Sequence, residues 1–236
     1  MRIILASASP RRRILLRQIG LTFEVVPAAV PEDVENGADP VMTVERLALS
    51  KAEAVVDRHQ SAGEYRKPAA GMSTTTGSKS AGNNGALFIG SDTVVVLDGN
   101  ILGKPESADR AAEMLRSLSG CTHQVYTGVG LIHTANSGVI LVRHRFHERT
   151  DVTFGDLTDD EIAAYVAGGS PMDKAGAYGI QDDLGALFVR KIDGDYYNVV
   201  GFPLYRFYRE VNKLVPGLVT PFEKAVADRT NVTTGI

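Results

Sequence analysis

The hydrophobic positions of this chain follow two different spacings, and each spacing predicts a different kind of element. Apolar residues run together or alternate in five segments, which is typical of β-strands. Elsewhere they recur every three or four residues between helix-capping residues, which indicates amphipathic helices. Strands are predicted at 3–5, 23–26, 87–97, 125–133 and 139–154, and helices from 10, at 43–57, from 107, from 158 and at 203–214. Because the two kinds of element alternate without strict repetition, we expect one α/β domain built on a mixed sheet.

Two segments follow neither spacing. Residues 60–86 interleave glycines with Ser, Thr, Asn and Lys, a composition that predicts a flexible insertion. Within it, residues 71–80 look like a P-loop, but the spacing is wrong and no strand precedes them, so we reject that interpretation. Residues 215–236 have no clear period and predict a loosely ordered tail. The folded domain is therefore predicted to span residues 1–214.

Composition narrows the class of protein without identifying a function. The chain has 236 residues, 44% hydrophobic and 22% charged, with a formal net charge of -3. This balance is typical of a globular domain and gives no overall basic field that would favour nucleic acid. The single cysteine, Cys121, excludes an intrachain disulfide and a cysteine metal cluster. No signal-peptide pattern and no membrane-spanning run is visible, so we expect a cytoplasmic protein without a membrane partner.

The start of the first helix carries the strongest indication of a ligand. Ser9 is a good N-cap and Pro10 a good first helical residue. Arg11, Arg12 and Arg13 follow in the first turn, where the helix dipole disfavours each cation by roughly 0.3–1 kcal/mol. A nearby anion would offset that cost, because helix N-termini and arginine side chains both suit phosphate oxygens. A polyphosphate cradle is one interpretation, and a solvated basic face is the other.

Three residues farther along the chain could act beside such an anion. Asp92 interrupts the apolar strand 87–97, where a lone carboxylate costs several kcal/mol. It could be a general base, a metal ligand or one partner of a structural salt bridge. Lys51 lies on the apolar face of helix 43–57, where snorkelling is the ordinary explanation. Lys104 lies in a constrained loop and, considered alone, indicates no function.

Other residues that bind metals give weaker patterns. Glu32 and Asp33 follow the second strand in a loop, where paired acids are usually solvated but where one could help to hold a divalent ion. His144 and His147 are three positions apart on an alternating strand and so face opposite sides. We therefore do not expect them to share a metal.

Segment 173–181 is dense in small and polar residues. Its closely spaced glycines indicate backbone held near a ligand. The amide of Gln181 could read the hydrogen-bonding edge of a base. The alternative is an ordinary loop plugged by a tyrosine.

Taken together, these segments resemble the Maf family of nucleoside triphosphate pyrophosphatases. Six ordered motifs at compatible spacing carry the resemblance, which covers residues 2 to about 213 apart from the insertion. The motifs are Leu5-Ala6-Ser7-Ala8-Ser9-Pro10-Arg11-Arg12 followed by Glu32, Leu47-Ala48-Leu49-Ser50-Lys51-Ala52, Gly90-Ser91-Asp92-Thr93-Val94-Val95, Gly103-Lys104-Pro105, 118–129 and 173–181, closed by 198–204.

The resemblance implies a fold, a reaction and a set of roles. The fold is an elongated, inosine-triphosphatase-like α/β domain of two lobes with a deep central cleft. The reaction is hydrolysis of a nucleoside triphosphate to the monophosphate and pyrophosphate with a divalent cation, usually Mg²⁺, often in a homodimer. Asp92 matches the family's proton acceptor, and Arg11, Thr93 and Gln181 look like the branch that acts on dTTP and UTP. The implied roles are catalytic for Asp92, Lys51 and Lys104, substrate-binding for Ser9, Arg11, Arg12, Thr93 and Gln181, and metal-binding for Glu32 and Asp92.

The chain departs from the family's pattern at the insertion and after Gln181, where Asp182 and Asp183 stand in place of the usual glycine. The second departure leaves the local loop geometry, and with it base selectivity, open. Two other functions remain: a pyrophosphatase for modified nucleotides such as 7-methyl-GTP, and a regulatory nucleotide-binding protein linked to septum formation. The complete set of charged residues argues against a regulatory protein that only binds nucleotide, because Asp92 would repel bound phosphates unless a metal intervened.

Overall fold

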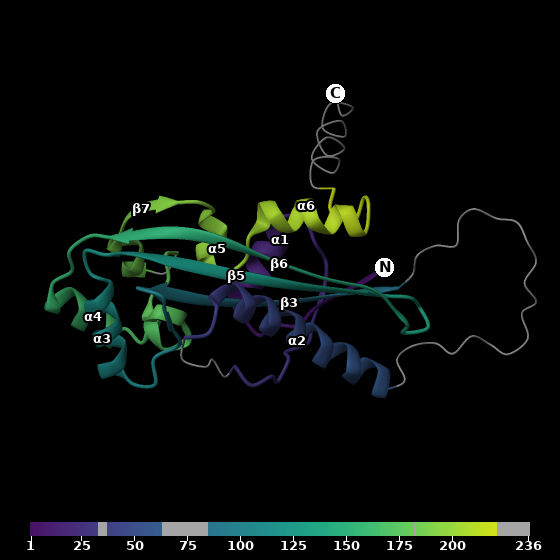
Figure 1. Cartoon of the computed structure of the whole chain (residues 1–236), viewed down its shortest axis with the longest axis horizontal. Coiled ribbons are helices and arrows are strands. Elements are labelled where there is room, and N and C mark those ends of the chain that lie inside the picture. The colour runs from purple at the N-terminus through teal and green to yellow at the C-terminus, as the bar shows by residue number, and fades with distance from the viewer. Residues whose placement is uncertain (33–36, 63–84, 182, 221–236) are drawn as a thin grey trace, which may run out of the picture.

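In the computed structural model, the described residues are 1–32, 37–62, 85–181 and 183–220. They form one mixed sheet whose longest strands follow the long axis of the molecule, with helices on both faces (Figure 1). The strands are β1 (Arg2–Leu5), β2 (Glu24–Val25), β3 (Ala86–Leu97), β4 (Asn100–Leu102), β5 (Thr122–Thr134), β6 (Ile140–Phe154) and β7 (Val189–Asp193). The α-helices are α1 (Pro10–Gln18), α2 (Pro40–Ser61), α3 (Ala108–Leu118), α4 (Asp159–Ala167), α5 (Tyr196–Val200) and α6 (Leu204–Leu214). The predicted α/β class is confirmed.

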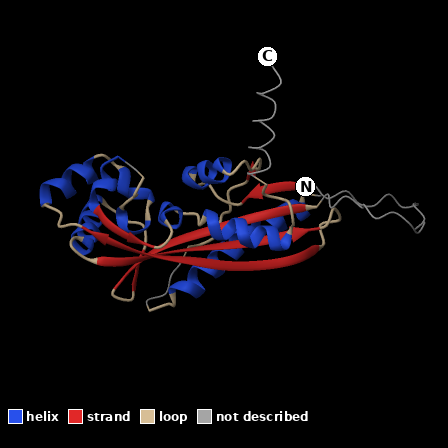
Figure 2. Cartoon of the chain, turned by 90° about the horizontal axis from the view of Figure 1, so that it is seen from above, coloured by secondary structure: helices blue, strands red, loops and turns tan. Residues whose placement is uncertain are grey.

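The sheet combines parallel and antiparallel pairing in the order β2-β1-β3-β5-β6-β7, with β4 also paired to β3. β1 runs parallel to β2 and β3, whereas β3, β5, β6 and β7 form an antiparallel series. Helices α3 and α4 gather at one end of the long strands, and α1, α2 and α6 lie toward the other (Figures 1 and 2). This division gives the elongated molecule the two lobes that the family resemblance implied.

Alternate residues of β3 pack into apolar clusters on opposite faces of the sheet, because successive side chains of a strand point to opposite faces. Leu87 and Val95 join the largest apolar cluster, which also holds buried residues of α1, α3 and α6. Phe88 and Val94 lie on the other face, among buried residues of α2. The strand is therefore covered on both faces, which explains its nearly continuous apolar sequence.

Three glycines let α2 approach the sheet unusually closely. A Cβ atom added at Gly90 would lie 2.0 Å from the carbonyl oxygen of Ala48, and one at Gly128 would lie 2.3 Å from that of Val44. One at Gly130 would lie 2.6 Å from backbone atoms of α2. No side chain other than hydrogen fits at these positions, so the glycines set the distance between the helix and β3.

Several element boundaries differ from the prediction. α2 begins at Pro40 rather than 43, because Asp39 caps it by accepting a hydrogen bond from the backbone N–H of Met42 at 2.8 Å. It ends at Ser61, inside the segment predicted as insertion, and β3 likewise starts within that segment. Residues 63–84, the rest of the predicted insertion, lie outside the described residues. Ser107 and Thr158 cap α3 and α4, the helices predicted from 107 and from 158, and Thr158 does so in a full capping box.

The predicted tail is packed at its start. Asn212 on α6 binds Val219 twice, accepting from its N–H at 3.3 Å and donating to its carbonyl oxygen at 3.1 Å. Val219 is buried against the largest core. A loosely ordered tail beginning at residue 215 is therefore wrong for residues 215–219, and residues 221–236 lie outside the described part of the chain.

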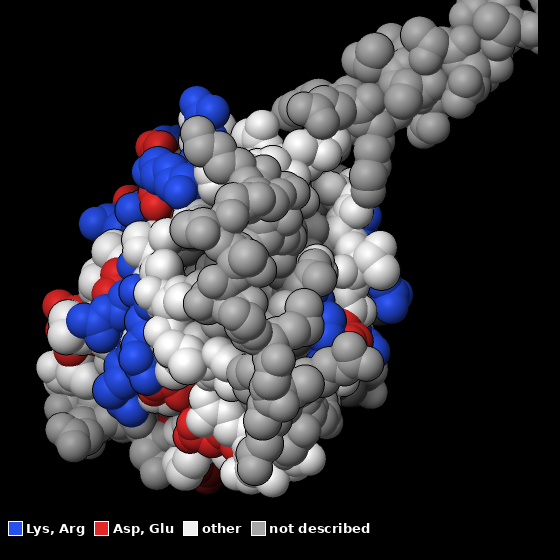
Figure 3. Space-filling view, turned by 90° about the vertical axis from the view of Figure 1, so that its right-hand side faces the viewer, with Lys and Arg blue, Asp and Glu red and all other residues white. Residues whose placement is uncertain are grey.

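The surface carries charges of both signs. On the face shown in Figure 3, Lys and Arg side chains lie beside Asp and Glu. Exposed ion pairs such as Arg143–Glu53, at 3.2 Å, join charges of opposite sign on the surface. Among the described residues, no helix has the length and apolar character needed to cross a membrane.

The substitution Gly128→Ala tests the close contact between α2 and the sheet. We expect it to lower the free energy of unfolding by about 1–3 kcal/mol, because the new methyl group meets backbone that cannot rotate away. Urea denaturation monitored by circular dichroism would measure the change. The matched control is Gly155→Ala, where nothing lies within 4 Å of the added Cβ. An equal effect of both substitutions would contradict the steric explanation.

Candidate active site

The cleft opens where the central strand β3 is unpaired on one edge. β1 pairs with β3 only as far as Ile89, and β4 pairs with the same edge only from Val95. Residues 90–94 therefore pair with β5 on one side and with no strand on the other. A cavity of about 720 Å³ fills this gap. All nine residues predicted for the site line it, namely Ser9, Arg11, Arg12, Glu32, Lys51, Asp92, Thr93, Lys104 and Gln181.

The loop between β1 and α1 forms one wall of the cleft. Ser9 occupies the N-cap position of α1, but its side chain makes no capping hydrogen bond, so the predicted cap is wrong in this respect. The backbone N–H of Ser9 instead donates to the hydroxyl oxygen of Ser7 at 3.2 Å. Ser7 also lines the cleft, and the prediction did not include it. The Ser9 hydroxyl is therefore not committed to the helix.

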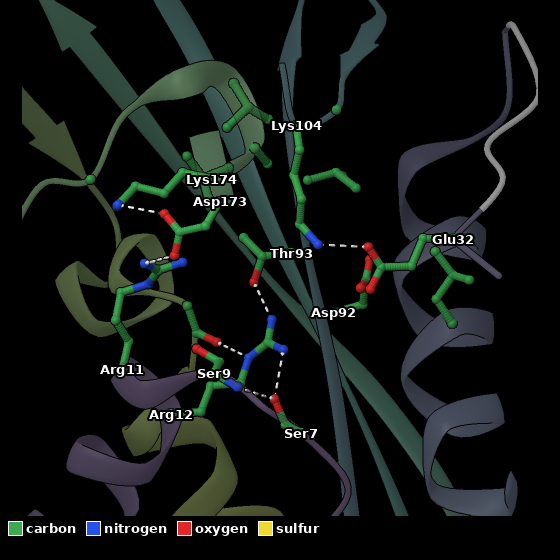
Figure 4. A pocket seen from close by; sticks show the side chains of 18 of the residues that line it. Ser7, Ser9, Arg11, Arg12, Glu32, Asp92, Thr93, Lys104, Asp173 and Lys174 are labelled. Atoms are coloured by element: carbon green, nitrogen blue, oxygen red, sulfur yellow. Dashed lines mark hydrogen bonds and ion pairs between the residues drawn. The ribbon is translucent and has the colours of Figure 1, made fainter. Parts of the chain in front are cut away.

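Arg12 connects three segments of the chain (Figure 4). Its Nε donates to the carbonyl oxygen of Gly201 at 3.0 Å, and one terminal nitrogen donates to the Ser91 carbonyl oxygen at 2.8 Å and to Ser7 Oγ at 3.3 Å. The other terminal nitrogen donates to Thr93 Oγ1 at 3.0 Å. These bonds occupy four of the five guanidinium N–H groups. Arg12 therefore fixes the cleft walls relative to one another, and at most one N–H remains for a ligand.

A chain of alternating charges crosses the cleft. Lys51 Nζ lies 2.6 Å from Asp92 Oδ1 and 2.7 Å from Glu32 Oε1, and Lys104 Nζ lies 2.8 Å from Glu32 Oε2. Lys51 and Asp92 are both buried, so the alternative explanation, in which Lys51 snorkels to solvent, does not hold. Burial raises the pKa of Glu32, but the hydrogen bonds from Lys104 and Lys51 outweigh it and lower that pKa to about 2. Glu32 is therefore an anion at neutral pH.

A second group of ion pairs lies on the opposite side of the cleft. Arg11 donates to Asp173 Oδ2 at 3.2 Å, and Lys174 donates to Asp173 Oδ1 at 2.7 Å (Figure 4). Asp173 and Lys174 line the cavity, yet the prediction gave them no role. The closely spaced glycines of segment 173–181, to which both residues belong, are the sequence feature that could have indicated a role for them.

Asp92 and Thr93 lie on opposite faces of β3, because they are consecutive residues of one strand. Asp92 faces α2 and Lys51, whereas Thr93 faces α1 and binds Arg12. Both reach the cavity, because it follows the bare edge of the strand and so opens onto both faces. Gln181 also lines the cavity, and Asp182, at which the family pattern changes, lies outside the described residues.

The residues present fit a divalent cation only in part. Within the described ranges, no group of three or more His, Cys, Asp or Glu residues could hold a metal. Asp33 lies outside those ranges. Glu32 and Asp92 bind the same lysine nitrogen and so lie close enough to contribute one carboxylate each. Magnesium is commonly held by one or two carboxylates together with substrate phosphates, so the donor set suits a cation that arrives with a nucleotide.

The two histidines excluded as a metal pair do bind different partners. His144 Nε2 lies 3.1 Å from Glu210 on α6, and His147 Nδ1 lies 2.8 Å from Glu45 on α2. They face opposite sides of β6, as the alternation of the strand requires.

A buried polar pair supports the loop that carries Gln181. The hydroxyl of Tyr178, which lines the cleft, lies 2.8 Å from Nε2 of the fully buried His123 on β5. Both rings pack edge-on against Phe154. The backbone N–H of Gly179 donates to the hydroxyl oxygen of Tyr165 on α4 at 3.1 Å. The loop is thus held at Tyr178 by its bond with His123 and at Gly179 by its bond with Tyr165, three and two residues before Gln181.

Burial also shifts the ionisation of His123. Desolvation lowers the pKa of this imidazole to about 4, against an opposing effect of the nearby Asp151. His123 is therefore neutral at physiological pH, and its hydrogen bond with Tyr178 does not depend on a charge.

Comparison with known proteins identifies relatives over most of the chain. A family model described as Maf-like protein matches residues 2–214. The dTTP/UTP pyrophosphatase of Moorella thermoacetica is 47% identical over 205 residues, which cover 86% of this chain and 90% of that protein. The dTTP/UTP pyrophosphatase of Bacillus cytotoxicus is 42% identical over 214 residues, covering 91% and 96%.

One solved structure, a nucleoside-triphosphatase / dITP/XTP pyrophosphatase from Mycobacterium abscessus, covers 91% of this chain and 94% of its own. Its TM-score is 0.36 at 14% identity, and a similarity at this level carries no functional weight.

The pKa of His123 predicts a specific loss of stability in mild acid. Between pH 6.5 and about 4, the unfolded chain binds a proton on this residue that the folded chain does not bind. The free energy of unfolding therefore falls as the pH is lowered through this window, by on the order of 3 kcal/mol from this group. Urea denaturation at several pH values should show a shallower decline in His123→Gln. Parallel declines in the two proteins would contradict the assignment.

Proposed function

The chain belongs to the Maf-like protein family, and on that basis we propose that it hydrolyses nucleoside triphosphates, dTTP and UTP above all, to the monophosphate and pyrophosphate. One observation carries the proposal. The buried carboxylate of Asp92 lies 2.6 Å from a lysine nitrogen inside a cleft rich in cations. A carboxylate next to a phosphate site can activate water, and the surrounding cations can stabilise the charge that develops on the phosphates.

The charge of the cleft suits a triphosphate bound with a metal. Of the described residues that line it, Arg11, Arg12, Lys51, Lys104 and Lys174 are cations, whereas Glu32, Asp92 and Asp173 are anions. The cations exceed the anions by two. A nucleoside triphosphate carries about four negative charges, and a bound divalent cation reduces this to about two. The excess charge of the lining therefore matches that of the metal complex.

The cationic side chains are held in place before the substrate arrives. Arg11 is held by Asp173, and Lys51 and Lys104 are held by Glu32. An arriving triphosphate can accept hydrogen bonds from the same nitrogens, with little side-chain movement required. Arg12 contributes its charge and one N–H while its other bonds keep the cleft walls together.

Asp92 acts as the general base in this scheme. It orients a water molecule toward the phosphorus and accepts its proton, while Lys51 and Lys104 stabilise the departing pyrophosphate. When bound, a divalent cation, Mg²⁺ by expectation, would polarise the phosphate oxygens, with Glu32 and Asp92 as its protein ligands. On the base side, Gln181 and Thr93 would contact a pyrimidine. The cytoplasmic location and the homodimer remain predictions from the sequence.

The substitution Asp92→Asn tests the proposed base. Pyrophosphate release by the purified protein with Mg²⁺ should fall by about 10²-fold or more, because the amide cannot accept the proton. The substrate panel would hold dTTP, UTP, CTP, dATP, GTP and 7-methyl-GTP. The matched control is Asp98→Asn, an exposed residue six positions along that lies outside the cleft and should retain full activity. Full activity in Asp92→Asn would refute the mechanism, and a preference for 7-methyl-GTP would refute the dTTP/UTP assignment.

Removing the metal should stop the reaction, and Glu32 should affect how tightly the metal is held. Excess EDTA should abolish turnover, and added Mg²⁺ should restore it. In Glu32→Gln, the Mg²⁺ concentration for half-maximal rate should rise by about tenfold or more, because one carboxylate ligand is lost. Glu24→Gln, which breaks an exposed pair with Arg2 outside the cleft, is the control. An unchanged Mg²⁺ dependence in Glu32→Gln would exclude Glu32 as a ligand.

A further inference from the structure

A chain of hydrogen bonds runs from Asn198 in α5 to the cleft. The hydroxyl of Thr127 on β5 donates to the backbone carbonyl oxygen of Asn198 at 3.0 Å. The same hydroxyl lies 3.0 Å from Thr93 Oγ1 on the neighbouring strand. Thr127 and Asn198 are fully buried, so water does not compete for these bonds. Only Thr93 reaches the cavity.

The direction of these bonds determines which atom receives the hydroxyl proton of Thr93. A hydroxyl has one proton to donate, and a carbonyl oxygen can only accept. Thr127 gives its proton to Asn198, so it must accept in its contact with Thr93. Thr93 therefore donates its own proton to Thr127, and it also accepts from Arg12 at 3.0 Å. Toward a ligand, the Thr93 oxygen has no proton left and acts only as an acceptor.

No side chain of the neighbouring Gly201 covers this oxygen. Gly201, which also lines the cavity, lies so close to Thr93 that an added Cβ would be in van der Waals contact with Thr93 Oγ1, at 3.8 Å. Gly201 has φ of 122°, a conformation that side-chain-bearing residues rarely adopt, so no side chain covers the hydroxyl from that direction. The remaining lone pair of Thr93 is thus accessible from the cleft.

An oxygen that can only accept distinguishes the pyrimidine bases. Uracil and thymine present an imide N–H between two carbonyl groups, whereas cytosine has an unprotonated ring nitrogen at that position. Where ring position 3 of the base faces Thr93, the imide N–H donates to the hydroxyl oxygen, whereas the unprotonated nitrogen of cytosine places a lone pair against the lone pair of that oxygen. Sites built to bond one polar group reject an analogue that leaves that bond unmade.

We propose that Thr127 is a specificity-determining residue, which makes Thr93 an obligate acceptor and thereby selects imide-bearing pyrimidine nucleotides against cytosine nucleotides. Thr127 does not touch the nucleotide and acts only through the proton of Thr93. The inference rests on the proposed function for its substrates, but the polarity of the hydrogen-bond chain does not depend on turnover.

The test compares UTP with CTP, because their bases differ in the pairing edge and not in size or phosphates. In Thr127→Val, Thr93 loses its acceptor and can turn its proton toward the cleft. The ratio of kcat/KM for UTP to that for CTP should fall by about tenfold or more. Thr127→Ser keeps the hydroxyl and should keep the wild-type ratio. Inhibition by pyrophosphate, which has no base, should change by less than about twofold in both variants.

A matched control separates selectivity from loss of a buried hydroxyl. Thr150 bonds the side chain of Asn198 at 2.9 Å and the backbone of Asp195 in the same network, but it does not contact Thr93. Thr150→Val should lower stability without changing the UTP to CTP ratio. A change of ratio as large as that in Thr127→Val would overturn the proposal, and so would an unchanged ratio in Thr127→Val.

Binding measurements keep this test separate from the proposed reaction. Calorimetry with α,β-methylene analogues of UTP and CTP gives the same ratio from dissociation constants, without hydrolysis. If the protein binds the UTP analogue selectively and Thr127→Val removes that selectivity, the inference stands even when no pyrophosphate is released. If the wild-type protein hydrolyses UTP and CTP equally and binds both analogues equally, the inference fails while the pyrophosphatase activity stands.

Discussion

The cleft depends on the contact between α2 and the sheet. Gly90 and Gly128 allow backbone of the helix to lie where side chains would otherwise be, and this brings Lys51 within 2.6 Å of Asp92. A helix at the usual distance would leave both charges buried and separated, which costs several kcal/mol per ion. The small residues of β3 and β5 and the charged residues of the cleft are thus parts of one arrangement. The glycines bring the two charges together, and the ion pair that they form compensates for the cost of burying them.

The same arrangement explains how a cleft with so many cations is stable without a ligand. Each cation that points into the cleft has a carboxylate or a backbone carbonyl as its acceptor. The low pKa of Glu32 follows from its hydrogen bonds with two lysines, which stabilise the carboxylate anion. In the proposed function, phosphate oxygens would take the positions of the Glu32 and Asp173 carboxylates. Binding would then exchange one set of oxygen acceptors for another, with the cationic side chains ordered beforehand.

Much of this could be predicted from the sequence, because the signals were local. The capping box of Thr158 and the apolar face of α2, with Lys51 on it, depend on residues a few positions apart. The cleft residues were found because their motifs are distinctive. What could not be predicted depends on contacts between distant segments. Nothing in the first turn of α1 indicates that Arg12 bonds Gly201, 189 positions away, rather than leaving its donors for phosphate. The hydrogen bond between His123 and Tyr178 likewise joins residues that carry no mutual signal in the sequence.

The bare edge of β3 has a consequence for self-association. A strand with unpaired backbone groups offers a template on which another polypeptide can add, and this hazard is greatest for long, flat, exposed edges. Here the unpaired stretch, residues 90–94, is bounded by β1 at one end and β4 at the other. Arg12 already bonds the carbonyl oxygen of Ser91 within it. The unpaired stretch is therefore too short, and too far occupied by the bond from Arg12, for another strand to add to it.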